Sequence, residues 1–218
     1  MKKLLFILVP LVLMAFDSNA HAFGYDLNGL TGLETGWVYF KIGFQHIIPY
    51  GFDHILFVLA LFFLNPNLKA VILQTTIFTL AHSITLGLSM IGKISPDTSV
   101  IEPIIALSIL FVAIENLFTA ELKWWRLILV FAFGLIHGCG FASALMDVGV
   151  PEENQLSMLL TFNLGVEAGQ LAVITMAWFL IAKWFNEMSW YRARVVIPIS
   201  SVIGCIALYW TIERAFFP

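Results

Sequence analysis

The residues best suited to chemistry in this chain are histidines and carboxylates that lie inside long apolar segments. Ionisable side chains cost roughly 2.5–3.5 kcal/mol each at the centre of a membrane helix, so their presence there suggests a function. Imidazole and carboxylate ligands without thiolate suit Ni, Co, Zn, Cu or Fe. The candidate metal ligands are His46, Asp53, His54, His82, His137 and Glu167.

The first three candidates flank a proline. His46 precedes the sequence Pro49-Tyr50-Gly51, and Asp53 and His54 follow it. Proline removes the backbone amide that would bond Gln45, so we expect the helix to kink or break there. In a straight helix His46 and Asp53 share a face but are separated by a rise of about 10 Å. They can share one ion only if the break folds them together; otherwise they are successive stations along a path.

The other candidates lie near the centres of later apolar segments. His82 is flanked by threonines and a serine, and His137 lies among small residues that allow helices to approach closely. Glu167 forms an i, i+4, i+7 polar stripe with Asn163 and Gln170. We expect these two amides to hydrogen-bond to ligands or neighbouring helices. Asp53, His54, His82, His137 and Glu167 all fall within about two helical turns of the expected midplane.

The composition is that of a membrane protein. Of the 218 residues, 60% are hydrophobic and 11% are charged, against about 25% charged in soluble domains. The bilayer must therefore take the place of water as the solvent. The net charge of -3 says little about a nucleic-acid partner, but no basic run marks a phosphate-binding face, so we expect none.

The chain divides into three parts. Residues 1–22 have a basic start, a short apolar core and small residues near Ala20 and Ala22, which is typical of a signal peptide cleaved after either alanine. Residues 23–36 form a periplasmic lead-in, and residues 37–218 a six-helix transmembrane domain. We therefore expect an all-α, polytopic membrane helix bundle. Six apolar segments are each long enough to cross about 30 Å of hydrocarbon: residues 37–64, 68–91, 100–118, 124–146, 156–184 and 195–212.

The basic residues predict the orientation. With the N-terminus outside after signal cleavage, six alternating spans place more basic residues on the cytoplasmic side than on the outer side, as the positive-inside rule requires. We expect a multi-pass protein of a bacterial-type inner membrane, with both the N-terminus and the C-terminus outside. The residues on the cytoplasmic side are Lys69, Lys123, Arg126, Lys183, Arg192 and Arg194.

Five short stretches carry a resemblance to a known family. They are FKIGFQH (40–46), GFDH (51–54), LAHSITL (80–86), GLIHG (134–138) and FNLGVEAGQ (162–170). Over about residues 37–185 the sequence resembles the HupE/UreJ family of nickel/cobalt permeases and hydrogenase/urease accessory proteins, closest to its second, divergent branch. The resemblance implies a membrane permease for Ni²⁺ or Co²⁺, preceded by a cleaved signal. Six residues separate His46 from Asp53, where the family pattern has five.

These observations favour a permease that passes a divalent transition-metal ion through a His/Asp/Glu site near the bilayer midplane. The ion, Ni or Co with Zn as a further candidate, is a substrate or ligand, no prosthetic group is expected, and a transporter is favoured over an enzyme. The partners are the ion and the lipid bilayer, and homo-oligomerisation stays open. One alternative is an intramembrane zinc-dependent hydrolase with three histidine ligands, assisted by Ser83 or Glu167. The other is a membrane accessory protein for metalloenzyme maturation.

Overall fold

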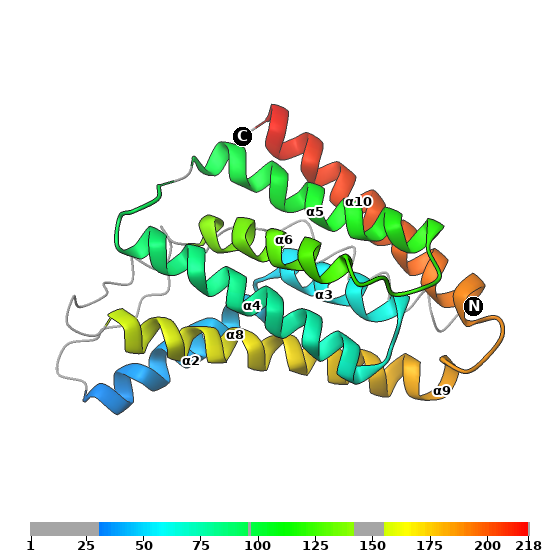
Figure 1. Cartoon of the computed structure of the whole chain (residues 1–218), viewed down its shortest axis with the longest axis horizontal. Helices are drawn as coiled ribbons and strands as arrows, with labels where there is room; N and C mark the ends of the chain where they lie inside the picture. The colour runs from blue at the N-terminus through cyan, green and yellow to red at the C-terminus, as the bar shows by residue number, and fades with distance from the viewer. Residues whose placement is uncertain (1–30, 96, 142–154, 218) are drawn as a thin grey trace.

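The computed structural model describes residues 31–95, 97–141 and 155–217 of the chain, and the regular structure in these ranges is entirely helical (Figure 1). The predicted all-α fold class is therefore confirmed. The predicted signal peptide, with both of its cleavage positions, lies outside the described residues. So do the last five residues of the fourth predicted span, 142–146.

Capping residues define several helix starts. Thr31 and Glu34 form a capping box at the start of α2, and the side chains of Asn67 and Asp97 accept backbone amides at the starts of α4 and α5. Two short π-helical segments adjoin the last helices. The segment η2 (Trp178–Ala182) and the α-helical turn α9 (Lys183–Phe185) prolong α8, and η3 (Arg192–Val196) leads into α10. The main helices are α2 (Gly32–Ile47), α3 (Phe52–Leu64), α4 (Leu68–Met90), α5 (Thr98–Phe118), α6 (Arg126–Gly140), α8 (Gln155–Ala177) and α10 (Ile197–Phe216).

The described helices provide four or five candidate membrane spans. Four are long and apolar enough to cross a bilayer, and α2 with α3 makes a fifth if the bent pair counts as one span. The first predicted span is thus two helices, bent by 67° at the break that Pro49 predicts. Helix α6 has 15 described residues, which rise about 22 Å, less than the roughly 30 Å of the hydrocarbon core.

Glycines allow the helices to pack in close pairs. Helix α2 packs along α8, α4 along α6, and α5 along α10, as Figure 1 shows. A Cβ atom on Gly43 would overlap the carbonyl oxygen of Phe162, and one on Gly165 would overlap that of Phe40. The close approach predicted around His137 is also confirmed, because a Cβ on Gly138 would overlap the carbonyl oxygen of His82.

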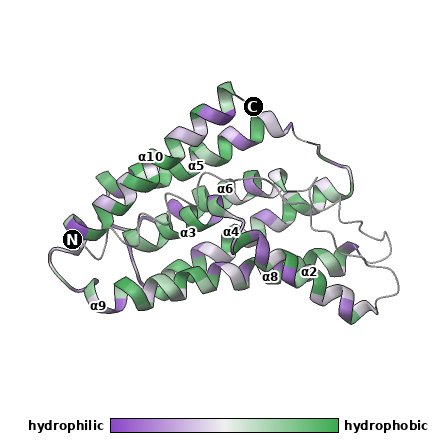
Figure 2. Cartoon of the chain, turned by 180° about the vertical axis from the view of Figure 1, so that it is seen from behind, coloured by the Kyte–Doolittle hydropathy of each residue, from purple (hydrophilic) through white to green (hydrophobic). Residues whose placement is uncertain are grey.

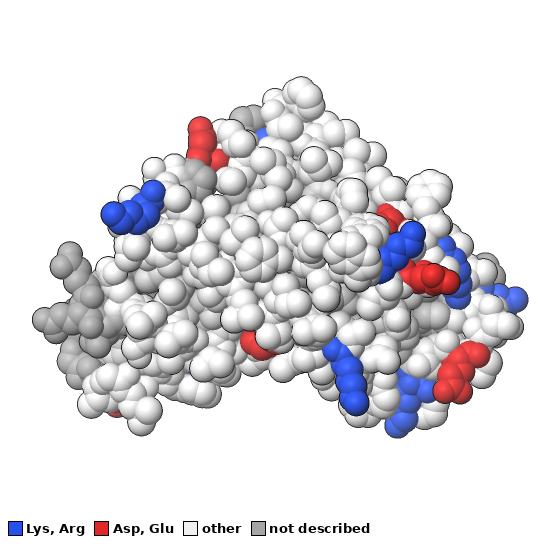
Figure 3. Space-filling view, in the orientation of Figure 1, with Lys and Arg blue, Asp and Glu red and all other residues white. Residues whose placement is uncertain are grey.

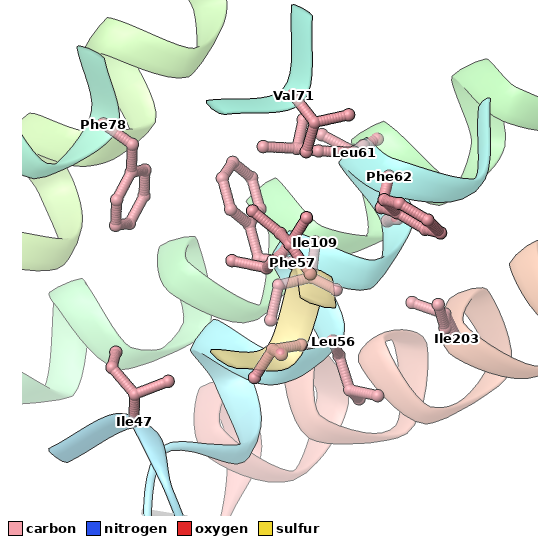
Figure 4. Packing of buried hydrophobic residues seen from close by; sticks show 14 of the residues in the cluster. Ile47, Leu56, Phe57, Leu61, Phe62, Val71, Phe78, Ile109 and Ile203 are labelled. Atoms are coloured by element: carbon pink, nitrogen blue, oxygen red, sulfur yellow. The ribbon is translucent and has the colours of Figure 1, made fainter. Parts of the chain in front are cut away.

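Helix α3 lies at the centre of the bundle. Nine of its 13 residues are buried, and it contacts α4, α5, α8 and α10. Figure 4 shows Phe57 and Leu61 of this helix packed among buried side chains such as Ile109 and Val71 from its neighbours. The residues at the start of α3 are therefore held in place by a tightly packed core.

The outer surface of the bundle is apolar between two charged ends. Large side chains such as Leu80 and Leu164 are about 60% exposed on the sides of the helices, and Figure 2 shows that apolar residues dominate along their length. The connections from α3 to α4, from α5 to α6 and from α9 to η3 lie at one end of the bundle in Figure 1, and Figure 3 shows most Lys and Arg side chains gathered there. This is the surface of a polytopic membrane protein.

Candidate metal centre

The break between α2 and α3 brings two histidines together. His46 lies in the last turn of α2 and His54 in the first turn of α3, and their ring centroids are 4.6 Å apart. Pro49 cannot donate an amide to continue α2. A Cβ on Gly51 would overlap the carbonyl oxygen of His46, so glycine permits the close return of the chain. The sequence between the two histidines thus folds them into one site.

His82 completes a group of three histidines. It lies in the middle of α4, and its ring centroid is 6.0 Å from that of His46 and 5.9 Å from that of His54. One ligand atom from each of the three residues lies within 4.8 Å of the others. The Nε2 atoms of all three are buried and lack a hydrogen-bond partner in the described part of the chain. Buried polar atoms of this kind call for a ligand, an ion or water.

Asn163 of α8 sets the orientation of the His82 ring. The Asn163 amide nitrogen donates to the carbonyl oxygen of Leu159 at 2.8 Å, which turns its Oδ1 toward His82 Nδ1 at 3.3 Å. Since Oδ1 can only accept, Nδ1 carries the proton and Nε2 keeps its lone pair. This confirms the expectation that Asn163 hydrogen-bonds to a candidate ligand, an arrangement typical of histidines that bind metals.

His137 of α6 lies beside this group but outside it. Its ring centroid is 5.1 Å from that of His54, whereas the group with mutually close ligand atoms holds only His46, His54 and His82. Ser108 of α5 donates its hydroxyl to the carbonyl oxygen of Ile105, so its oxygen accepts from His137 Nε2 at 3.0 Å. The Nδ1 atom of His137 therefore keeps its lone pair, and it is buried without a hydrogen-bond partner among the described residues.

Aromatic side chains surround the histidines. The rings of Phe141 and Phe162 lie 3.9 Å and 5.8 Å from that of His46, centroid to centroid. The ring of Phe78 lies 5.7 Å from that of His54 and 4.9 Å from that of His137. Apolar walls keep bulk water away from ring nitrogens, so an ion bound here would exchange its hydration shell for imidazole.

Asp53 points to a different partner. Arg214 near the end of α10 donates to both of its carboxylate oxygens, at 3.0 and 3.1 Å, and also lies 3.4 Å from a carboxylate oxygen of Glu102. Such a bidentate pair fixes the carboxylate geometrically. The structure therefore brings His54 into the histidine group but places its neighbour Asp53 in an ion pair that joins α3, α5 and α10.

Glu167 also lies apart from the three histidines. Its carboxylate accepts hydrogen bonds from the hydroxyl groups of Thr76 at 2.7 Å and Thr79 at 2.6 Å, both on α4. Of the six predicted ligands, the structure thus groups His46, His54 and His82, puts His137 next to them, and separates Asp53 and Glu167.

The sequence did not predict Ser108 as a partner of His137, Arg214 as a partner of Asp53, or the burial of Arg126. Arg126 is 1% exposed and pairs with Glu115 at 2.7 Å, with Gln74 at 3.1 Å as a further acceptor. A signal for Arg214 exists, because it falls in the last turn of an apolar helix, where a long cationic side chain can reach inward. Ser108 had no distinguishing pattern.

The fold and the site define a helical membrane protein with a buried histidine cluster that can hold a transition-metal ion. The sequence matches the HupE / UreJ protein family over residues 29–214, and the chain belongs to that family. Comparison with curated proteins and with solved structures found no match.

Proposed function

We propose that this protein is an inner-membrane permease for a divalent transition-metal ion, Ni²⁺ or Co²⁺, and that the ion passes through His46, His54 and His82. The observation that carries this proposal is the set of three buried Nε2 atoms, unpartnered among the described residues, in a group whose ligand atoms lie within 4.8 Å of one another. Membership of the HupE/UreJ family supports it, because the resemblance implies nickel/cobalt permeases and metalloenzyme accessory proteins.

The spacing of the nitrogens suits an ion that binds and leaves. A metal with ligand nitrogens at about 2.0–2.1 Å in tetrahedral geometry holds those nitrogens about 3.4 Å apart. The ligand atoms here lie within 4.8 Å of one another, so a bound ion would draw the three rings slightly closer together. Three neutral imidazoles leave the full charge of the ion uncompensated and at least one coordination position open. Conduction requires binding that is weak enough to permit release.

The protein would cross the membrane six times, with both termini outside and the basic end of the bundle in the cytoplasm. The described residues of α6 are too few for a full membrane span, so the count of six spans depends on this helix. A reporter enzyme fused after Pro218 tests this topology. Activity in the periplasm supports the six-span arrangement, and activity in the cytoplasm contradicts it.

Transport is tested by uptake of a panel of radioactive divalent ions into proteoliposomes that contain the purified protein. We expect saturable uptake of nickel or cobalt, and its loss in His54→Ala and in His82→Ala. Ser89→Ala is the matched control, because Ser89 is a buried polar residue of α4 (6% exposed) that is not part of the histidine group.

Two other results would reject the permease. Tightly bound zinc together with turnover of a lipid or peptide would favour a hydrolase, although Ser83 already donates to the carbonyl oxygen of Thr79 and Glu167 is held by two threonines. Folded protein that binds no metal would favour an accessory role.

A further inference from the structure

A second polar cluster lies between α4 and α8, and the histidine site does not use it. Its centre is Glu167, which accepts hydrogen bonds from Thr76 and Thr79. Thr79 is the twelfth of the 23 residues of α4, and Glu167 is the thirteenth in the 31-residue helical stretch Gln155–Phe185. A carboxylate at this depth suggests a functional site.

The cluster has more acceptor oxygens than hydroxyl protons to share among them. The single proton of the Thr79 hydroxyl faces three acceptors: Glu167 Oε2 at 2.6 Å, the carbonyl oxygen of Thr75 at 3.0 Å and Gln170 Oε1 at 3.1 Å. Thr76 supplies one more proton, to Glu167 Oε1. In the described ranges, the cationic side chains in ion pairs are Arg126 and Arg214, and neither pairs with Glu167. The negative charge of this carboxylate is thus left without a cationic side chain.

Gln170 provides an independent sign of a missing ligand. The residue is 0% exposed, and its Nε2 atom lacks a hydrogen-bond partner within the described part of the chain, while its Oε1 faces Thr79. Turning the amide over would let the nitrogen donate to Thr79, but would then leave the oxygen unsatisfied. In the first orientation the nitrogen can donate to a water molecule that hydrates a bound cation, and in the second the freed oxygen can coordinate the cation directly.

We propose that Glu167, Thr76, Thr79 and Gln170 form a binding site for a monovalent hard cation, Na⁺. Carboxylate, hydroxyl and amide oxygens are ligands for hard cations, whereas transition metals prefer the imidazole nitrogens of the other site. The single carboxylate balances one positive charge. The proposal goes beyond the proposed function, since it assigns a second ion to a second set of residues.

The two sites share the same pair of helices. On α4, Thr79 and His82 are separated by three residues, a rise of about 4.5 Å. On α8, Asn163, which holds His82, and Glu167 are separated by four residues, a rise of about 6 Å. A cation that draws Thr79 and Glu167 together also fixes the spacing of α4 and α8 at the histidine site. Bound sodium would therefore modulate the affinity of the histidine site, but neither ion requires the other in order to bind.

The test is binding of radioactive sodium to the purified full-length protein in detergent, with potassium as the background salt. We expect saturable binding in the wild type, its loss in Glu167→Gln, and weaker binding in Thr79→Val, which keeps the shape of the side chain. His54→Ala is the matched control and should bind sodium normally. Nickel binding is measured on the same samples, so that failure of the metal site is seen separately.

Three results would overturn the proposal. One is the absence of saturable sodium binding in folded wild-type protein, which includes the case in which the Glu167 carboxylate binds only a proton. The second is wild-type sodium binding in both Glu167→Gln and Thr79→Val. The third is loss of sodium binding in His54→Ala together with loss of nickel binding in Glu167→Gln, because a single site would then hold both ions.

Discussion

Replacing Asn163 with alanine should weaken metal binding without removing a metal ligand. Asn163 Oδ1 accepts the proton of His82 Nδ1 and thereby leaves Nε2 free for the ion. Loss of such a partner typically lowers metal affinity 10- to 100-fold, or by about 1.4–2.7 kcal/mol. The distance of 3.3 Å is longer than the usual value of about 2.9–3.0 Å for an N–H···O bond. We therefore expect a loss near the lower limit, about tenfold.

The assay is equilibrium dialysis of the purified protein against radioactive nickel. Asn163→Asp keeps an acceptor at the same place and should bind nickel at least as tightly as the wild type. Asn116→Ala is the matched control, since it removes a buried amide that bonds to Ala60, Ser200 and Arg126 rather than to a histidine. Wild-type affinity in Asn163→Ala, or an equal loss in Asn116→Ala, would refute the assigned role of His82 Nε2.

Three further predictions concern stability and pH. Gly43→Ala should destabilise the protein by about 1–3 kcal/mol, because its Cβ would overlap the backbone of Phe162; thermal unfolding in detergent would show this, and Gly36→Ala, whose Cβ has only an ordinary contact at 3.6 Å, should change little. Arg126→Met should destabilise by about 3–5 kcal/mol, because it leaves the buried Glu115 carboxylate unpaired; the same unfolding measurement should show partial recovery when Glu115→Gln is added. Since only neutral imidazole binds a metal, the apparent nickel affinity should fall as acid protonates the three histidines, and nickel that stays bound in dialysis as the pH is lowered until the protein unfolds would contradict histidine ligands.

The break at Pro49 could be predicted from the sequence, but its outcome could not. Proline and glycine predict that the helix ends, and the structure confirms a 67° bend. Asp53 and His54 are adjacent, about 100° apart around a helix, so only the rotation of α3 decides which of them meets His46. That rotation is set by the packing of its nine buried residues against the neighbouring helices, and the pattern of a single segment does not contain it.

The partners of the charged residues could not be predicted from the sequence either. Arg214 and Asp53 are 161 residues apart in the chain, and a single sequence gives no sign of a pairing over that distance. Arg126 lies at the expected cytoplasmic end of the fourth predicted segment, where a charge is usually solvated, yet it is buried between Glu115 and Gln74. In contrast, the small residues around His137 and the polar stripe of α8 gave correct local predictions, because close helix contact and hydrogen bonding between neighbouring helices follow from residue type.

X-ray absorption spectroscopy of the nickel-loaded or cobalt-loaded protein tests directly whether His46, His54 and His82 bind the ion. We predict one bound ion per chain with three imidazole nitrogens in its first coordination shell, and loss of one imidazole from that shell or of binding itself in each of the His→Ala variants at these positions. An oxygen-only coordination shell, or an unchanged spectrum in all three variants, would show that these histidines are not the ligands.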